Sequence, residues 1–311
     1  MIKSSILDAV GHTPLIKLSR IVPADCADIY VKYEGMNAGG SIKTRVALAM
    51  IEEAEKKGLI GPDSIIVEPT SGNQGIGLAL CCAVKGYRAV IIMPDSVSEE
   101  RRKLIKQYGA ELILIPDKGD IGECIDKCLE TAMKMKNDDP RVYVPQQFEN
   151  PANPMIHKTS TAAEIISDME ASGLNIDGFC SGFGTGGTIS GVGNALRKRY
   201  PDIQIWVSEP EKAAVLSGGK IGTHMQMGIG DGIIPENLDT SVYDEIYIVT
   251  DETAIHMAKE LARLEGLLCG ISSGTNVATA IELARRLGKG KNVVTILPDT
   301  GERYFSTPLF D

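Results

Sequence analysis

A lysine that follows a glycine-rich turn is the first pattern in this sequence that could carry chemistry. Residues 39–43 read GGSIK, and residues 44–57 then place apolar and charged side chains at helical spacing. Lys43 is therefore expected in the first turn of a helix, where unpaired backbone amides disfavour a cation and lower the pKa of the amine. A neutral lysine amine attacks carbonyl carbons, which is the Schiff-base chemistry of enzymes that use pyridoxal 5'-phosphate (PLP). This stretch alone leaves open an ordinary solvated lysine beside a tight turn.

A second polar loop interrupts an apolar segment further along the chain. Residues 64–68 (SIIVE) are typical of a buried strand, and residues 69–75 (PTSGNQG) separate this strand from an apolar helix. Thr70, Ser71 and Asn73 offer hydroxyl groups, an amide and the free backbone amides of a helix start. These groups suit a carboxylate, so we expect the loop to bind one.

A third loop, residues 182–188 (GFGTGGT), follows an expected strand and opens an expected helix. Its backbone amides could hold a phosphate at the helix N-terminus. The loop also matches GxGxxG, and Glu209 ends the next strand, as a dinucleotide-binding site requires. The loop alone therefore leaves PLP, NAD and a glycine turn needed only for packing as alternatives. An NAD-dependent dehydrogenase would need a second polar site for hydride chemistry, and the 4 histidines show no paired pattern for one.

Strands and helices are expected to alternate along most of the chain. The expected strands are 28–34, 64–68, 89–94, 111–116, 142–144, 177–181, 203–208, 245–249 and 292–297. The expected helices are 44–57, one ending near Lys85, 98–108, 120–136, 156–169, one ending at Tyr200, 251–266 with Asp251 as its N-cap, and one opening at 270–274. Because the strands are apolar almost throughout, the pattern predicts an α/β fold with mostly parallel sheets covered by helices. Ligands of such sheets bind at the carboxyl ends of the strands, where the polar loops lie.

Composition and charge narrow the class of protein. The chain has 311 residues, enough for about two domains, with ordinary hydrophobic (43%) and charged (23%) content for a soluble enzyme. Its net charge of -9 argues against a nucleic-acid surface. Short apolar runs and an N-terminus without a signal-like segment lead us to expect a cytoplasmic protein that binds no membrane. The 7 cysteines form no CxxC pair, and Cys124 and Cys128 have no histidine beside them, so we expect reduced thiols and no metal site.

Four separated segments, taken in their order along the chain, point to one family. They are the lysine, the two polar loops described above, and Ser272, which opens a further helix with a hydroxyl group. With these segments, the chain resembles the cysteine synthase (O-acetylserine sulfhydrylase) and cystathionine β-synthase family of fold-type II PLP enzymes. The resemblance runs from GHTPL at residues 11–15 to PDTGERY at residues 298–304.

The resemblance implies two α/β domains of the tryptophan synthase β-like kind. Residues 1–150 would contain the smaller, mobile domain, about 45–150, while residues 10–34 would pack on the other half of the chain. Residues 151–311 would form the larger domain, which binds the phosphate of PLP. The loose boundary near residue 150 falls in a segment with two prolines and two asparagines. The family also implies a homodimer.

The resemblance implies a role for each polar segment. Lys43 would form the Schiff base with PLP and later move the proton on Cα, while Asn73 would contact the ring hydroxyl. Ser272 would meet the pyridine nitrogen, where a neutral hydroxyl suits replacement at Cβ better than chemistry that needs a strong electron sink. The residues implied to bind the cofactor phosphate are Gly184, Thr185, Gly186, Gly187 and Thr188. The residues implied to grip the substrate carboxylate are Thr70, Ser71, Asn73, Gln74 and Gln146, with Gln147 as an alternative to Gln146.

The reaction implied is replacement of a group on Cβ of a serine-type amino acid. The donor would be L-cysteine, O-acetylserine or serine, and the incoming nucleophile would be sulfide or another thiol. The remaining alternative from another class is a scaffold that only binds a partner. The intact lysine and phosphate loop argue against it.

Asp231 departs from the cysteine synthase pattern, in which a small residue usually lies over the active site. A carboxylate facing the reacting carbon would repel hydrosulfide and could instead deprotonate water or a thiol, or hold an ammonium group. Our hypothesis is that the enzyme uses L-cysteine as donor and releases hydrogen sulfide, giving serine with water or lanthionine with a second cysteine. The alternative is that Asp231 points to solvent and that O-acetylserine and sulfide give cysteine and acetate.

Overall fold

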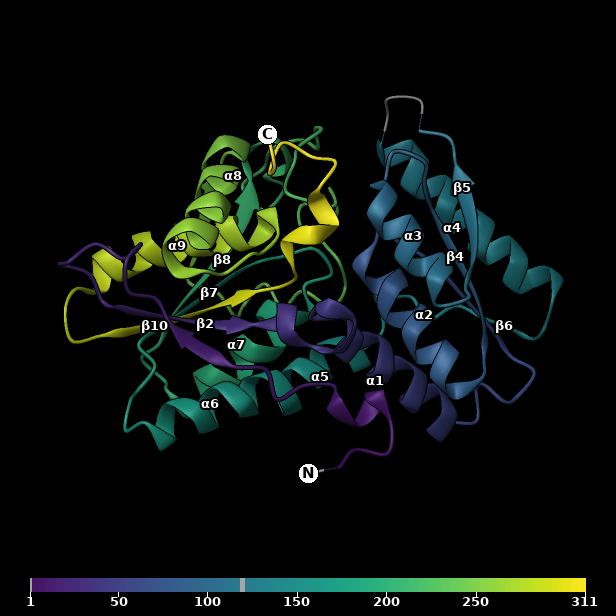
Figure 1. Ribbon diagram of the computed structural model, residues 1–311, viewed down its shortest axis with the longest axis horizontal. Coiled ribbons are helices and arrows are strands. Elements are labelled where there is room, and N and C mark those ends of the chain that lie inside the picture. The colour runs from purple at the N-terminus through teal and green to yellow at the C-terminus, as the bar shows by residue number, and fades with distance from the viewer. Residues whose placement is uncertain (1, 118–120) are drawn as a thin grey trace.

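The computed structural model describes residues 2–117 and 121–311, which form two sheets with helices around them (Figure 1). The four-stranded sheet is parallel and has the order β5 (Glu111–Ile115), β4 (Arg88–Pro94), β3 (Ile65–Pro69), β6 (Val142–Tyr143). The six-stranded sheet has the order β1 (Leu15–Lys17), β2 (Asp28–Tyr33), β10 (Asn292–Leu297), β7 (Gly178–Gly182), β8 (Gln204–Pro210), β9 (Glu245–Val249). Its strands are parallel except β1, which pairs with β2 in the antiparallel sense. The predicted α/β fold class is confirmed.

Helices cover both faces of the four-stranded sheet. They are α1 (Lys43–Lys56), α2 (Asn73–Lys85), α3 (Glu99–Gln107) and α4 (Ile121–Asp138). Successive residues of a strand point to opposite faces, so Ile66 packs in a core with α1, α2 and α3, while Ile65 and Val67 face α4. This burial on both faces explains why the strands read as continuous apolar runs.

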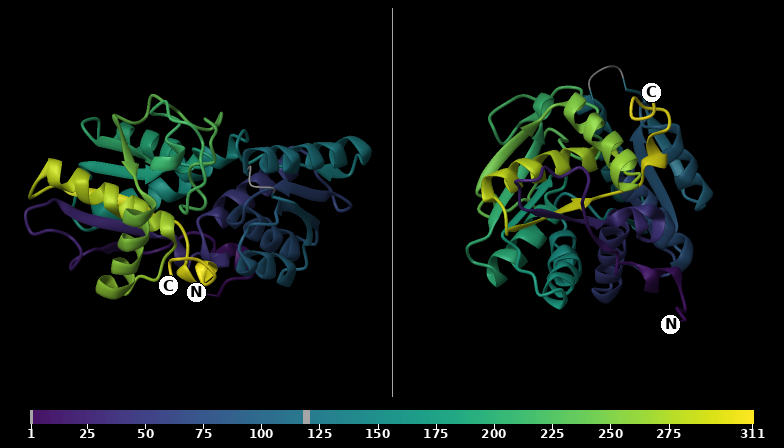
Figure 2. Two further views of the ribbon diagram at one scale, coloured as in Figure 1. Left: turned by 90° about the horizontal axis from the view of Figure 1, so that it is seen from above. Right: turned by 60° about the vertical axis from the view of Figure 1, so that its left-hand side comes forward.

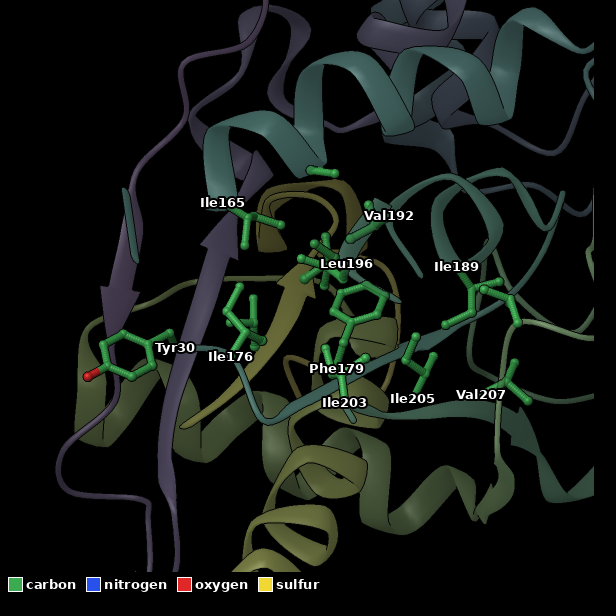
Figure 3. Close-up of a cluster of buried hydrophobic side chains, with 14 of the residues drawn as sticks. Tyr30, Ile165, Ile176, Phe179, Ile189, Val192, Leu196, Ile203, Ile205 and Val207 are labelled. Atoms are coloured by element: carbon green, nitrogen blue, oxygen red, sulfur yellow. The ribbon is translucent and has the colours of Figure 1, made fainter. Parts of the chain in front are cut away.

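The six-stranded sheet is covered in the same way. Its helices are α5 (Ala152–Ile156), α6 (Ala162–Ala171), α7 (Gly187–Arg199), α8 (Asp251–Glu260) and α9 (Ile271–Leu287). Val294 and Ile296 of β10 join the core under α6 and α7, part of which Figure 3 shows around Phe179. The alternate residues, Val293 and Leu297, face α9. No helix within the described ranges is long and apolar enough to cross a membrane.

The shorter elements refine the expected boundaries. Short 3₁₀ helices span Ile6–Ala9, Glu34–Met36, Ala38–Gly40, Glu211–Ala213 and Gly301–Tyr304, and π-helical turns span His157–Thr161 and Leu261–Glu265. The helix expected at 156–169 is thus part of a longer helical stretch that begins at residue 152. The prediction that Asp251 is an N-cap is wrong, because Thr250 caps α8 by accepting from Thr253 N. The carboxylate of Asp251 instead accepts from the backbone of Met225 and from Lys212.

A strand from the start of the chain lies inside the sheet formed by its second half. In the views of Figures 1 and 2, β2 lies with β10, and the register pairs Ile29 with Val293. Parallel strands end at the same edge, so the loop after β2, which leads to Lys43, meets the loop after β10. Ile42 N donates to Pro298 O at 2.9 Å.

A buried ion network fixes α1 to the elements around it. The guanidinium of Arg45, whose side chain is 1% exposed, donates to both carboxylate oxygens of Glu34 at 2.9 Å and of Glu164 at 2.6 and 2.8 Å. Lys32 on β2 lies 2.8 Å from Glu164. Because Arg45 follows Lys43 by two positions, the network also holds the start of α1 in place.

Replacing Arg45 with methionine should lower the free energy of unfolding by about 3–5 kcal/mol, because Glu34 would stay buried without its counterion. Urea denaturation measures the change. The matched control is Arg199→Met, since Arg199 pairs with Glu170 on the surface. Its loss should stay below about 1 kcal/mol. Equal losses for the two variants would contradict the structural role given to Arg45.

Candidate active site

A pocket of about 340 Å³ lies between the two sheets, at the carboxyl ends of β3 and β7 and the N-termini of α1, α2, α7 and α9. It brings together the polar loops that the sequence singled out. The predicted site residues that line it are Lys43, Thr70, Ser71, Asn73, Gln74, Gln146, Gly184, Thr185, Gly186, Thr188, Asp231 and Ser272. Gly187, the first residue of α7, is buried and does not line the pocket.

Lys43 is the first residue of α1 and its half-buried side chain lines the pocket. Its Nζ lies 3.3 Å from Oγ1 of Thr185. Burial lowers the pKa of Lys43 to about 8, although Asp231 and Glu68 act in the opposite direction. The direction agrees with the prediction, and the largest cause is desolvation of the amine. The amine is therefore a usable nucleophile near neutral pH.

The glycine loop at 182–188 leaves no room for side chains on its far side. A Cβ on Gly184 would lie 2.5 Å from Gly228 O, and one on Gly187 would lie 2.0 Å from Oδ1 of Asn153. Gly186 has φ of +76° and caps α7 without a side-chain hydrogen bond, so the first amides of α7 stay free for a ligand. A backbone cradle of this kind, opposite a lysine amine, fits the phosphate of PLP.

Asn153 supports this loop and was missed by the sequence analysis. It is fully buried, and its Nδ2 donates to Oγ1 of Thr185 and to Gln147 O, both at 2.9 Å. Its Oδ1 has no hydrogen-bond partner among the described residues. The sequence offered only a loop with two prolines at this point, which indicated a boundary rather than a site.

The guanidinium of Arg303 connects the glycine turn before Lys43 to Asn73. Arg303 donates to the backbone carbonyls of Gly39 and Gly40 and, through Nε, to Oδ1 of Asn73 at 3.0 Å. Nδ2 of Asn73 donates to Asp299 at 2.6 Å. The two charged neighbours therefore fix the orientation of the amide. PDTGERY at 298–304 contributed to the family resemblance, but nothing in the sequence assigned its residues a role.

Glu68 is a buried carboxylate that the sequence analysis also passed over. It is 1% exposed, lines the pocket, and accepts from the backbone amides of Gln146 and Gln147 at 3.0 Å each. Burial raises its pKa to about 7, and the two backbone hydrogen bonds oppose this rise. It holds Gln146 at a φ of +56°, with the Gln146 amide turned toward Glu149. A polar residue at the end of an apolar strand was the available signal.

The predicted substrate loop, residues 69–75, and the start of α2 present several polar groups. Thr70 accepts from the backbone amide of Gly72 at 3.2 Å, and Ser71 is exposed. The amide of Gln74 is buried, and neither its oxygen nor its nitrogen has a partner among the described residues. Ser272, the second residue of α9, is 3% exposed and reaches the pocket from the opposite side.

Asp231 lies on the long loop between β8 and β9 and lines the pocket. Its Oδ2 is 2.9 Å from the place that a Cβ on Gly184 would occupy. Burial raises the pKa of the carboxyl group, while Lys43 and His224 act to lower it. A carboxyl group thus lies beside the phosphate cradle and within the electrostatic reach of the lysine amine.

The lowered pKa of Lys43 predicts a pH dependence. Only the neutral amine attacks an aldehyde, so capture of PLP by the apoenzyme should accelerate as pH rises and level off above about pH 8. An amine with the ordinary pKa of 10.5 would keep accelerating to that value. Stopped-flow absorbance measures the rate, and Lys43→Ala should yield no borohydride-stable adduct. A midpoint near pH 10 would contradict the assignment.

Comparison with known proteins agrees with this geometry. The family model described as pyridoxal-phosphate dependent enzyme matches residues 6–299. The chain is 51% identical over 306 residues to a cysteine synthase of Staphylococcus aureus, covering 98% of this chain and 96% of that protein. The match resolves the choice that GxGxxG left open in favour of PLP.

Solved structures show the same likeness. O-ureido-L-serine synthase is 42% identical with a TM-score of 0.93, covering 100% of this chain and 96% of that chain. A hydrogen sulfide-producing enzyme of Fusobacterium nucleatum is also 42% identical, with a TM-score of 0.91 and coverage of 97% of this chain and 100% of that one. The chain belongs to the pyridoxal-phosphate dependent enzymes and is a cysteine synthase-like enzyme that replaces the group on Cβ of an amino acid.

Proposed function

We propose that this enzyme takes L-cysteine as its donor, replaces the thiol on Cβ and releases hydrogen sulfide. The observation that carries the proposal is the carboxyl group of Asp231, which lines the pocket beside Gly184. With water as acceptor, L-cysteine and water give L-serine and hydrogen sulfide. With a second cysteine as acceptor, two molecules of L-cysteine give lanthionine and hydrogen sulfide.

The residues around the cofactor have separate tasks in this proposal. Bound PLP withdraws electrons from Cα of the amino acid, so that the group on Cβ can leave. Lys43 takes and returns the proton on Cα, which suits an amine whose pKa is about 8. The residues that hold the cofactor are Lys43, Asn73, Gly184, Thr185, Gly186, Gly187, Thr188 and Ser272. Asn73 offers a second N–H to the pocket, since Asp299 takes the first.

The substrate carboxylate lies, in this proposal, on the loop that opens α2. Thr70, Ser71 and Asn73 supply side chains, and the first amides of α2 supply unpaired N–H groups, since Gly72 caps the helix without a side chain. Gln74 and Gln146 complete the set; the amide of Gln146 must turn away from Glu149 to do so. The smaller domain, about residues 45–150, closes over the bound amino acid.

Asp231 decides the nucleophile. An ionised carboxylate repels hydrosulfide, which is the nucleophile of an ordinary cysteine synthase, but it accepts a proton from water or from a neutral thiol. Because burial raises its pKa, the group exchanges protons closer to neutral pH than an exposed aspartate does. It thereby activates the nucleophile and discourages the reverse reaction with sulfide.

Both possible directions have support among similar proteins. The Fusobacterium nucleatum enzyme produces hydrogen sulfide and supports release. The Staphylococcus aureus relative is a cysteine synthase and favours the second candidate, in which O-acetylserine and sulfide give cysteine and acetate. Absorbance scans with L-cysteine and separately with O-acetylserine, while sulfide is followed, distinguish the two. Faster sulfide consumption with O-acetylserine than sulfide release from cysteine would favour the second.

Replacing Asp231 with asparagine should lower the rate of sulfide release from L-cysteine by at least about 100-fold, because the variant lacks the proton acceptor. The visible absorbance of bound PLP should persist. Glu236→Gln is the matched control, since Glu236 is exposed on the same loop, and it should release sulfide at the wild-type rate. If sulfide release survives in Asp231→Asn, the proposal fails.

A further inference from the structure

We propose that Arg101 binds the carboxylate of the acceptor, so that the preferred acceptor is a thiol bearing a carboxylate, such as a second amino acid. This inference rests on the proposed replacement site and deepens it by naming the class of nucleophile. Neither Arg101 nor its helix α3 was among the predicted site residues.

Arg101 is a buried cation whose neighbours are neutral. Its side chain is 3% exposed and lines the pocket. Nη1 donates to the thioether sulfur of Met227 at 2.8 Å, and the guanidinium lies 4.8 Å from the centre of the Tyr304 ring. Among the described residues, Nε has no hydrogen-bond partner and no carboxylate forms an ion pair with the guanidinium.

The other buried arginines show how unusual this environment is. Arg45 has two carboxylates, Glu34 and Glu164. Arg303 donates to four oxygen atoms of the backbone and of side chains. A buried guanidinium without an anion is unfavourable because the cation has lost its water, and this cost is recovered when an anion enters. The free donors of Arg101 therefore indicate an anionic ligand in the pocket.

The position of Arg101 indicates which anion this is. Its Cδ lies 2.5 Å from the place of a Cβ on Gly72, so the side chain passes against the loop that opens α2. Its guanidinium reaches Met227, on the same loop as Asp231. The carboxylate of the donor already has the hydroxyls and amides of residues 70–73. The anion on the Met227 side is then the second reactant, with its thiol near Asp231.

The chemistry balances without an oxidant or a reductant. The thiol proton passes to Asp231, the sulfur forms a bond to Cβ, and the bond from Cβ to the leaving group breaks with its electron pair. The leaving group then takes up the proton. O-acetylserine and a thiol give a thioether amino acid and acetic acid, while two cysteines give lanthionine and hydrogen sulfide.

The experiment uses O-acetylserine as donor, so that it does not depend on sulfide release from cysteine. The acceptors are 3-mercaptopropionate, which has a carboxylate, and 2-mercaptoethanol, which has a hydroxyl group instead. For Arg101→Gln we expect kcat/KM for 3-mercaptopropionate to fall by about 10- to 100-fold, as expected for a charged hydrogen bond. The value for 2-mercaptoethanol should stay within about threefold. Comparing variants on the same thiol cancels differences in intrinsic reactivity.

Two controls keep the test decisive. Lys103→Gln removes a positive charge from the exposed side of α3, where Lys103 is 72% exposed. It should leave kcat/KM unchanged for both thiols. Arg101→Lys keeps the charge and should recover part of the preference, which also covers a failure of the glutamine variant to fold. Equal losses for the two thiols would overturn the proposal. So would a higher KM for O-acetylserine alone, which would assign Arg101 to the donor carboxylate.

Discussion

The guanidinium of Arg303 is the interaction on which the pocket depends. It joins the carbonyls before Lys43 to the side chain of Asn73 at the start of the neighbouring helix α2. It can do so only because β10 lies beside β2, so that the segment after β10 meets the glycine turn. The turn before Lys43 and the start of α2 are thus tied to each other by one cation that follows β10.

Buried charged side chains have ion-pair partners outside the pocket but lack them inside it. Outside it, Arg45 and Lys32 are paired with carboxylates at distances below 3 Å, and the network serves to hold helices together. Inside it, the charges of Lys43 and Asp231 affect each other's pKa without a direct ion pair, and Arg101 has neutral neighbours. Uncompensated groups of this kind cost stability, and they are useful where a charged reactant supplies the missing partner. The contrast separates the structural ion pairs from the groups expected to meet substrate.

Much of the fold and part of the site follow from local sequence. The apolar runs predicted the parallel strands, because a strand buried on both faces has apolar residues at nearly every position instead of alternating apolar and polar ones. Lys43, Ser272 and the glycine loop were found because each opens a helix. Arg303, Asp299 and Asn153 were not, since their partners are far away in sequence and periodicity does not encode strand order. For the same reason, local sequence did not show that desolvation lowers the pKa of Lys43, because distant segments bury this side chain.

The position of β2 between β1 and β10 also affects how the chain folds as it is made. Ile29 and its partner Val293 lie far apart along the chain, so Ile29 is synthesised long before β10. Until then one edge of β2 has no parallel neighbour, and closing so long a loop carries an entropic cost. A nascent chain that stops short of β10 therefore leaves the backbone N–H and C=O groups on this edge of β2 unpaired, and it lacks Asp299 and Arg303, which orient Asn73 in the pocket.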